Sequence, residues 1–236
     1  MKWLITIVLF LVCFTQVVFA QNGRQYISIG VGPSMIYADN AGIYSQFEFQ
    51  IQPVVTLAYN HPITSEFDLR STIGGQKLNS GGFDPLGSYR VAQWSERGQA
   101  FDFKGMAYFA DVMPTYIINP NTPGRAGEIV NFYVGLGLGV IHVQREQQTL
   151  RDPVYVNNVF VSGRIEEGKA NNTALYVPLR LGVSTNLEYD WDVSFELSAL
   201  TTTSSKLDGN TYQYKSIRPE LLMQFQINII RYLSRW

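Results

Sequence analysis

The chain has 236 residues, 16% of them charged, and a formal net charge of −1. This length suits a single domain, and the lack of a basic block argues against nucleic-acid binding by electrostatic attraction. A soluble domain would usually carry more charge, and a helical membrane protein would be more apolar.

Residues 1–20 have the pattern of an export signal. Lys2 supplies a positive charge, an apolar run from Leu4 to Val12 follows, and Ala20 ends a small-residue cleavage site before Gln21. We therefore predict cleavage between Ala20 and Gln21. An N-terminal membrane anchor is the alternative, and the shortness of the apolar run argues against it.

After the signal segment, the chain repeats a period-two alternation of apolar and polar residues. Each stretch is long enough to cross a membrane as a tilted strand of about nine to eleven residues. Strands of soluble sandwiches are shorter, usually about five or six residues. Within the fourth stretch the alternation changes phase near Gly105, which predicts a β-bulge there. The alternating stretches are residues 27–37, 47–60, 66–74, 101–118, 132–141, 175–184, 191–198 and 217–229.

This pattern predicts an all-β fold, an eight-stranded antiparallel up-and-down transmembrane β-barrel. Bacterial single-chain barrels have an even number of strands, and lipid offers no hydrogen bonds, so the first and last strands should pair. Short links on one side of the membrane and long polar links on the other are typical of such barrels. The short periplasmic links would be 60–65, 119–128 and 186–190. The long extracellular links would include 75–98 and 147–171.

The link 147–171 contains two β-prone triplets, 154–156 and 159–161, on either side of Asn157 and Asn158. This arrangement predicts a hairpin above the membrane. The triplets are too short to span lipid, so they are not counted as barrel strands. A ten-stranded barrel is the alternative.

Aromatic residues on the apolar face gather at the predicted periplasmic strand ends. Amphipathic rings favour the membrane interface, so these residues should form a girdle. The predicted girdle consists of Tyr59, Phe67, Tyr116, Phe132, Trp191 and Tyr232.

The face opposite the apolar one carries charges of both signs. Buried charges persist mainly when they are paired, so this pattern favours an internal network over a charge-selective pore lining. Antiparallel pairing would place Arg180 roughly opposite Glu196, with Arg218 one diagonal step away. A proton or ion relay through this network is the functional alternative. The predicted inward charges are Glu48, Asp68, Arg70, Asp111, Arg180, Asp192, Glu196, Arg218 and Glu220. The predicted structural cluster consists of Arg180, Glu196, Arg218, Glu220 and Asp192.

The residues indicate neither a cofactor nor a metal site. The single cysteine, Cys13, lies in the signal segment, so the mature chain would have no disulfide and no thiolate ligand. No glycine-rich phosphate loop is evident, because Gly135, Gly137 and Gly139 lie inside a predicted strand, where they suit close packing.

The signal segment, the eight alternating stretches and a last strand leading to Tyr232 and Trp236 resemble the small bacterial outer-membrane β-barrel family of the OmpA and OmpX type, with a porin-like barrel. The resemblance covers residues 21–236 as one barrel domain after the signal peptide of residues 1–20. It implies an outer-membrane location, contact with outer-membrane lipid, and recognition of the C-terminal aromatic by the barrel-assembly machinery. Trp236 lies a few residues beyond the regular alternation, which makes the match to that signal imperfect.

Three functions remain open at this point. The first is a structural, non-enzymatic barrel that binds a surface ligand or protein through the links 75–98 and 147–171. The second is a narrow channel or carrier for small solutes. The third is an enzyme at the rim, which would depend on His61 or His142, and neither has an evident Ser or Asp partner in the sequence. A soluble ligand-binding barrel of lipocalin type is the alternative fold, and its apolar rows would point inward.

Overall fold

The computed structural model describes residues 24–43, 48–120, 129–157, 159–185, 190–210 and 219–233. One helix lies in these ranges, α2 (Tyr89–Glu96). None of the helical residues described is part of a helix long and apolar enough to cross a membrane. The strands are β1 (Tyr26–Tyr37), β2 (Gly42–Ile43), β3 (Glu48–Phe49), β4 (Gln52–Pro62), β5 (Phe67–Asn79), β6 (Ala100–Ile117), β7 (Val130–Leu136), β8 (Leu138–Val156), β9 (Val159–Thr185), β10 (Trp191–Thr202) and β11 (Leu221–Tyr232).

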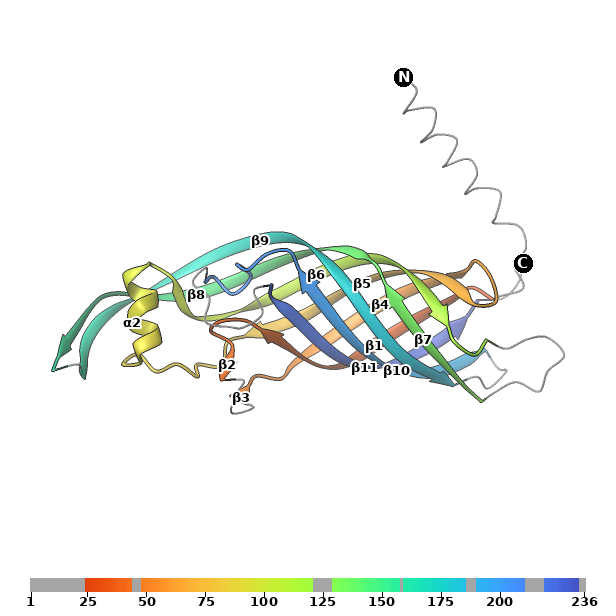
Figure 1. The fold of residues 1–236 in the computed structure, drawn as a ribbon, viewed down its shortest axis with the longest axis horizontal. Coiled ribbons are helices and arrows are strands. Elements are labelled where there is room, and N and C mark those ends of the chain that lie inside the picture. Colours follow the sequence, from red (N-terminus) through yellow and green to blue (C-terminus); the bar gives the residue numbers. More distant parts are fainter. Residues whose placement is uncertain are drawn as a thin grey trace, which may run out of the picture.

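The long strands close into an antiparallel barrel (Figure 1). The order of neighbours is β1, β4, β5, β6, β7 with β8, β9, β10 and β11, and β11 pairs back with β1, where Ile29 faces Ile229. β7 and β8 are two parts of one barrel strand, because both follow the same register against β6 and against β9. The barrel therefore has eight strands, which confirms the predicted fold and excludes the ten-stranded alternative.

The interruption between β7 and β8 has a local cause in β9. Gly137 lies opposite Pro178, and its N–H donates to the Pro178 carbonyl at 3.2 Å. Proline has no N–H with which to return the bond. The ladder therefore loses one bond at Gly137 while the register continues unchanged.

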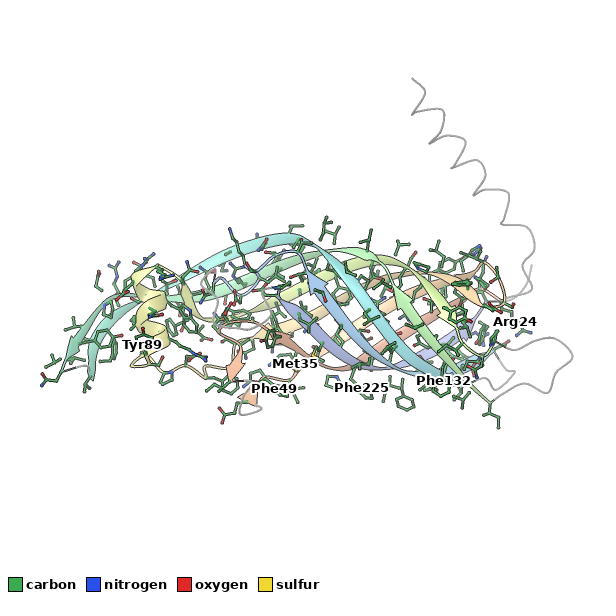
Figure 2. All side chains as sticks on the ribbon, viewed as in Figure 1. Arg24, Met35, Phe49, Tyr89, Phe132 and Phe225 are labelled. Atoms are coloured by element: carbon green, nitrogen blue, oxygen red, sulfur yellow. The ribbon has the colours of Figure 1, made fainter. Side chains whose placement is uncertain are left out.

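The apolar rows point outward. Ile29 is 55% exposed, Ile73 58% and Ile227 46%, and Phe132 and Phe225 lie on the outer surface of the barrel (Figure 2). The side chains that alternate with these rows are polar and buried: Ser28, Thr56, Asn60, Thr72, Ser194, Ser198, Gln226 and Asn228. A soluble lipocalin-type barrel would have the opposite arrangement, so this outer surface is suited to lipid.

The bulge predicted near Gly105 is wrong. β6 keeps one register against β8 from Asp102 onward, and the irregularity lies between Ala100 and Asp102. The apolar residues of the sequence change phase here because the interior becomes apolar along β6 while the strand continues without a bulge. Phe103 and Phe109 face inward there, in positions that polar residues occupy elsewhere in the lumen.

Two ends of the barrel can be distinguished. One end holds Arg24 (Figure 2) and Leu233, whose N–H donates to the Gln25 carbonyl at 2.8 Å, and also the short turn between β4 and β5. By the usual asymmetry of such barrels it is called the periplasmic end below. The opposite end is called the extracellular end. The links 121–128 and 186–189, within two of the predicted periplasmic links, lie outside the described residues.

The aromatic girdle at the periplasmic end is present with one correction. The rings of Phe67 and Tyr116 are 5.0 Å apart. Tyr232 does not belong to the outer row, because it pairs with Tyr26, whose hydroxyl donates to the buried Asp68 at 2.8 Å. The exposed members are Tyr59, Phe67, Tyr116, Phe132 and Trp191.

The predicted long extracellular links are more regular than the sequence indicated. In the link 75–98, β5 continues to Asn79, and α2 occupies residues 89–96. The link 147–171 is strand on both sides of the turn, which confirms the hairpin but makes it the continuation of β8 and β9. Asn157 at this turn has a φ of 51°, as the two-residue turns of hairpins require.

Candidate functional site

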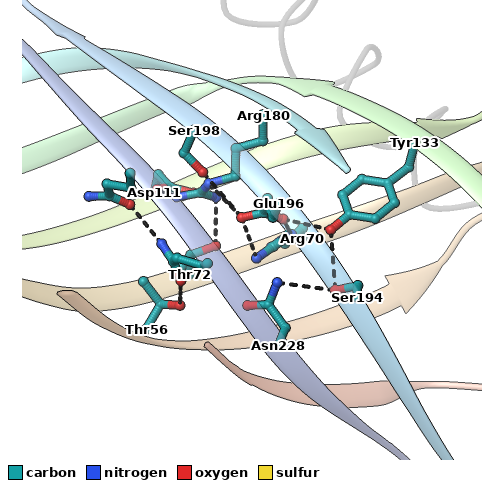
Figure 3. A network of polar contacts seen from close by, with 12 residues as sticks. Thr56, Arg70, Thr72, Asp111, Tyr133, Arg180, Ser194, Glu196, Ser198 and Asn228 are labelled. Atoms are coloured by element: carbon teal, nitrogen blue, oxygen red, sulfur yellow. Dashed lines mark hydrogen bonds and ion pairs between the residues drawn. The ribbon is translucent and has the colours of Figure 1, made fainter. Parts of the chain in front are cut away.

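Arg180 of β9 lies at the centre of the lumen and is 1% exposed (Figure 3). Its guanidinium donates to both carboxylate oxygens of Asp111 on β6, at 2.8 and 2.6 Å, and to the hydroxyl of Thr72 on β5 at 2.8 Å. Its Nε lies 3.6 Å from Oε1 of Glu196 on β10. One side chain therefore ties three separate strands to its own across the barrel.

Glu196 is held by a second arginine. Arg70 of β5 donates from both of its terminal nitrogens to Glu196, with the longer bond at 3.3 Å. Glu196 also accepts from the hydroxyls of Tyr133 at 2.8 Å and Ser198 at 3.2 Å. Two arginines and two carboxylates thus balance each other in what we call the luminal charge cluster, formed by Arg70, Asp111, Arg180 and Glu196.

The structure brings together two residues of the cluster predicted from sequence, Arg180 and Glu196. They are diagonal neighbours, because Arg180 faces Ser198 and Glu196 faces Gly182 in the register of β9 and β10. Arg218, the third predicted member, lies outside the described residues.

The other two predicted members lie at opposite ends of the lumen. Asp192 is near the periplasmic end and accepts from the hydroxyl of Thr185 at 3.0 Å. Glu220 is near the extracellular end and accepts from the backbone N–H groups of Leu207 at 2.7 Å and Asp208 at 3.3 Å. Neither is part of the luminal charge cluster.

Arg70 and Asp111 form the other half of the luminal charge cluster. The sequence predicted that both point inward but did not predict that they belong to this cluster. Charge balance could have pointed to them, since two buried arginines need two carboxylates. Of the other predicted inward charges, Asp68 is buried, whereas Glu48 lies in the short strand β3 and is exposed. The predicted cleavage site at Ala20 and Gln21 lies outside the described residues.

Two glycines of the barrel wall make room for interior rings. A side chain at Gly182 would begin 2.1 Å from the ring of Tyr133, and one at Gly139 would begin 2.4 Å from the ring of Tyr176. Tyr133 and Tyr176 both donate to carboxylates of the luminal charge cluster, at 2.8 and 2.5 Å. The glycines are therefore needed for close packing around the cluster.

An apolar plug fills the lumen on the extracellular side of the charge cluster. Tyr176 joins the two layers, since its ring packs edge-on against Phe109 at 6.4 Å while its hydroxyl donates to Asp111. Every barrel strand contributes to the plug. Its buried members on the strands are Ile36, Val54, Leu78, Phe103, Ala107, Phe109, Ile141, Val143, Ala174, Tyr176, Leu200 and Leu222.

Two extracellular links fold over the plug as a cap. Residues 38–41 follow β1 and residues 203–210 follow β10. The N–H of Asp39 donates to the carboxylate of Asp208 at 3.0 Å, and Arg145 donates to the carbonyl of Leu207 at 3.2 Å. Leu207 is itself fully buried among the plug residues. The extracellular half of the lumen is thus closed by packed side chains.

Beyond the cap, β8 and β9 continue together away from the barrel (Figure 1). We call residues 146–156 and 159–169, with α2, the extension. A two-stranded ribbon is marginally stable alone, but here Val91 and Trp94 of α2 and Leu150 of β8 form a buried core. Ser95 also donates to the Leu150 carbonyl at 2.7 Å. The extension therefore has a small core of its own, separate from the barrel.

The tip of the extension exposes apolar side chains. Tyr155 and Phe160 pack edge-on against each other, with ring centroids 5.7 Å apart, and Phe160 packs on the core around α2. Val156 faces Val159 across the turn. Four valines are between 49% and 65% exposed at this tip: Val154, Val156, Val159 and Val161.

Charged residues flank these valines along the ribbon. Arg151 donates to Glu166 at 3.0 Å, and Arg164 also pairs with Glu166. The hydrogen bond from Arg151 is the main reason that the pKa of Glu166 lies below its usual value. Nearer the barrel, Glu146 lies 3.4 Å from Lys104 and 3.5 Å from Lys169.

The two histidines lie far apart. The His142 ring contacts the hydroxyl of Thr173 at 2.8 Å and the amide of Gln144 at 3.4 Å on the outer face of the wall. His61 contacts the side chain of Gln25 at 3.1 Å near the periplasmic end. Within the ranges that the structure covers, no group of three or more His, Cys, Asp or Glu side chains is placed to hold a metal ion.

A closed ring of eight antiparallel strands, apolar outside and polar or packed inside, defines the fold as that of a small outer-membrane β-barrel. No protein-family model and no curated protein sequence matches the chain. Solved outer-membrane barrels do resemble it. Neisserial surface protein A is 8% identical, with a TM-score of 0.50, over 89% of this chain and 97% of that one.

Two further barrels show a similar extent of overlap. Ail, the attachment invasion locus protein of Yersinia pestis, is 14% identical in its complex with sucrose octasulfate, with a TM-score of 0.45, over 90% of this chain and 100% of that one. The N-terminal barrel domain of Pseudomonas aeruginosa OprF is 11% identical, with a TM-score of 0.38, over 89% of this chain and 99% of that one. At these identities the likeness concerns the fold alone.

Proposed function

We propose that this protein resides in the bacterial outer membrane as a non-conducting, non-enzymatic barrel and binds a macromolecular partner through its extension. The observation that carries the proposal is the contrast between a filled lumen and an ordered extension with exposed apolar residues. Exposed apolar patches on a stable surface mark interaction sites. The hairpin tip, with Val156 and Val159 facing outward, is such a patch.

The filled lumen argues against the channel alternative. A solute would have to pass the paired charges around Arg180 and then the apolar plug around Tyr176, with Leu207 closing the cap. Conduction needs a continuous wet path. The packing therefore favours a closed barrel whose function lies above the membrane.

The contacts of His142 argue against the rim-enzyme alternative. A general base needs a nucleophile and an orienting group in hydrogen-bonding geometry. The ring of His142 has a threonine hydroxyl on one side and a glutamine amide on the other, on the outer face of the wall. Thr173 is also its cross-strand neighbour, so this contact is the ordinary pairing of two polar residues on one face.

A shortened variant tests the proposal. Arg151 and Arg164 are cross-strand partners, so residues 152–163 can be replaced by an Asn-Gly turn that keeps the register of the strands below, although the core around α2 loses its contact with Phe160. Cells displaying the full or shortened chain are compared for attachment to immobilised extracellular-matrix and serum proteins. Purified protein is also reconstituted in planar bilayers.

We expect the full chain to attach to at least one of the proteins, the shortened chain to lose this attachment, and both to fold and remain silent in the bilayer. A heat-dependent shift in gel mobility reports folding of each variant. Equal attachment of both variants, or stepwise single-channel currents from the full chain, would contradict the proposal.

A further inference from the structure

The outer part of β9 has one edge to which no described strand is paired. β9 pairs with β8 along one edge from Val159 to Tyr176. On the other edge, β10 pairs with β9 only from Tyr176 to Ser184. The last described backbone bond on that edge runs from the N–H of Thr203 to the carbonyl of Leu175 at 2.8 Å.

Two hydrogen bonds show which residues of β9 turn their backbone groups toward this edge. The carbonyl of Leu175 accepts on the β10 side, whereas the carbonyl of Pro178 accepts from Gly137 on the opposite side. Residues of an antiparallel strand point their N–H and C=O groups to alternate sides. The register of β8 and β9 is regular from Arg164 to Tyr176, so the alternation holds throughout. The backbone groups directed to the open edge belong to Ile165, Glu167, Lys169, Asn171 and Thr173.

This edge is held in place by the neighbouring strands. β8 lies against β9 on one side and against β6 on its own far side, where Lys104 faces Glu146. Strand addition is favoured by such a preformed edge, because then mainly the incoming chain loses conformational entropy on binding. Lysine on an edge commonly discourages pairing. Here Lys169 lies 3.5 Å from Glu146, and Glu167 accepts from Gln148 at 3.1 Å, so both side chains contact β8 and not the edge to which no described strand is paired.

The side chains along the edge define the chemistry of an added strand. Ile165 is 44% exposed and favours an apolar neighbour. Glu167 favours a basic neighbour, and Lys169 an acidic one. At Gly168 an added Cβ would meet no atom within 4 Å, which leaves room for a ring of the partner on the other face.

We propose that residues 165–173 of β9 bind an extended polypeptide segment as an additional antiparallel strand. Read from its N-terminus to its C-terminus, the bound segment has an acidic residue, then an aromatic residue, then a basic residue, and an apolar residue two positions after the basic one. This rests on the proposed function and specifies the partner as a protein segment with this charge order. The backbone edge adds to the affinity that the apolar tip gives for the whole partner, and the two charges set the register of the added strand.

The probe is the labelled peptide acetyl-Thr-Thr-Thr-Val-Glu-Tyr-Lys-Thr-Val-amide, in which the acidic residue would face Lys169 and the basic residue Glu167. Binding to the full chain in detergent is followed by fluorescence anisotropy. We expect saturable binding, and binding about tenfold weaker when the acidic and basic residues of the peptide are exchanged. The double variant Glu167→Lys with Lys169→Glu should reverse this preference.

Methylated peptides test the backbone geometry directly. N-methylation of the glutamate and lysine of the peptide removes N–H groups that point at β9, so binding should be lost. N-methylation of the tyrosine removes an N–H that points away, and this matched control should bind. The proposal is overturned if the peptide does not bind or if the two charge orders bind equally. It is also overturned if only N-methylation of the tyrosine abolishes binding, or if the chain forms a stable dimer through this edge that excludes the peptide.

The two proposals can fail separately. The shortened variant lacks residues 152–163 but keeps residues 165–173. Attachment that depends on the extension, combined with no peptide binding, refutes strand addition and leaves the proposed function standing. Failure of both experiments refutes both.

Discussion

Replacement of Arg180 by methionine should destabilise the barrel more than loss of any surface arginine. Arg180 donates two hydrogen bonds to Asp111 and one to Thr72, all with the partners buried. Hydrogen bonds to charged groups contribute about 1.5–3 kcal/mol each. Methionine fills most of the volume but leaves the Asp111 carboxylate with only the Tyr176 hydroxyl as a described donor. Breaking a buried pair by removing one partner costs about 3–5 kcal/mol, which is the expected loss.

The assay is denaturant unfolding of the reconstituted protein, followed by tryptophan fluorescence and by heat-dependent gel mobility. The matched control is Arg231→Met at the periplasmic rim, where Arg231 and Asp190 are 45% and 60% exposed and 3.3 Å apart. Such exposed pairs are worth about 0–1 kcal/mol. The double variant Arg180→Met with Asp111→Asn should recover about half of the loss, because the uncompensated carboxylate is removed.

Equal losses for Arg180→Met and Arg231→Met would refute this reasoning. That result would mean that water reaches the luminal charge cluster and solvates Asp111 when the arginine is removed. A double variant no more stable than Arg180→Met alone would show that the buried charge of Asp111 is not the source of the cost.

Three further predictions concern other parts of the molecule. Gly182→Leu should abolish heat-modifiable folding, because its Cβ would lie 2.1 Å from the ring of Tyr133, whereas Gly168→Leu, with no atom within 4 Å, should fold normally. Leu207→Ala should lower the free energy of unfolding by about 2–5 kcal/mol, since Leu207 is fully buried in the plug; a loss below 1 kcal/mol would mean the cap packs loosely. The pKa of Glu166 is lower in the folded protein than its unfolded value near 4.5. The ionised Glu166 therefore stabilises the extension fully above that pH, and the stabilisation is lost as the pH falls below it. The amide protection factors of the extension, which correct for the intrinsic slowing of exchange in acid, should therefore fall relative to their values at pH 7, and Glu166→Gln should reduce this fall.

The alternation of residues was sufficient to predict the barrel. A strand between lipid and a packed lumen has two unlike faces, so Ile29 and Ile227 alternate with polar residues in a period of two. Lipid forbids an open edge, which requires β1 to meet β11 although they lie at opposite ends of the sequence. Fold and lipid-facing side therefore follow from the pattern alone.

The period-two alternation does not identify a strand where both of its faces are exposed to water. Outside the two β-prone triplets at the tip, the outer parts of β8 and β9 are mostly polar, so residues 147–153 and 162–171 have no sustained period of two and resemble a loop. The sequence predicted the hairpin at its tip, but only the structure shows that the ribbon continues down to the barrel and packs against α2 through Trp94 and Leu150. Likewise Phe103 and Phe109 face inward on β6, and the sequence cannot distinguish an apolar plug from a change of phase.

The pairing of the inward charges was decided by the tertiary structure. Arg180, Glu196, Arg70 and Asp111 come from four strands that meet only after the barrel closes. The position of each of these side chains along the barrel axis depends on the register of every strand pair. A small change in a turn moves Arg180 from opposite Glu196 to opposite Ser198. Local sequence determines which face each charge occupies, but the accumulated register around the closed ring determines which charges meet, because that register is a property of all eight strands together.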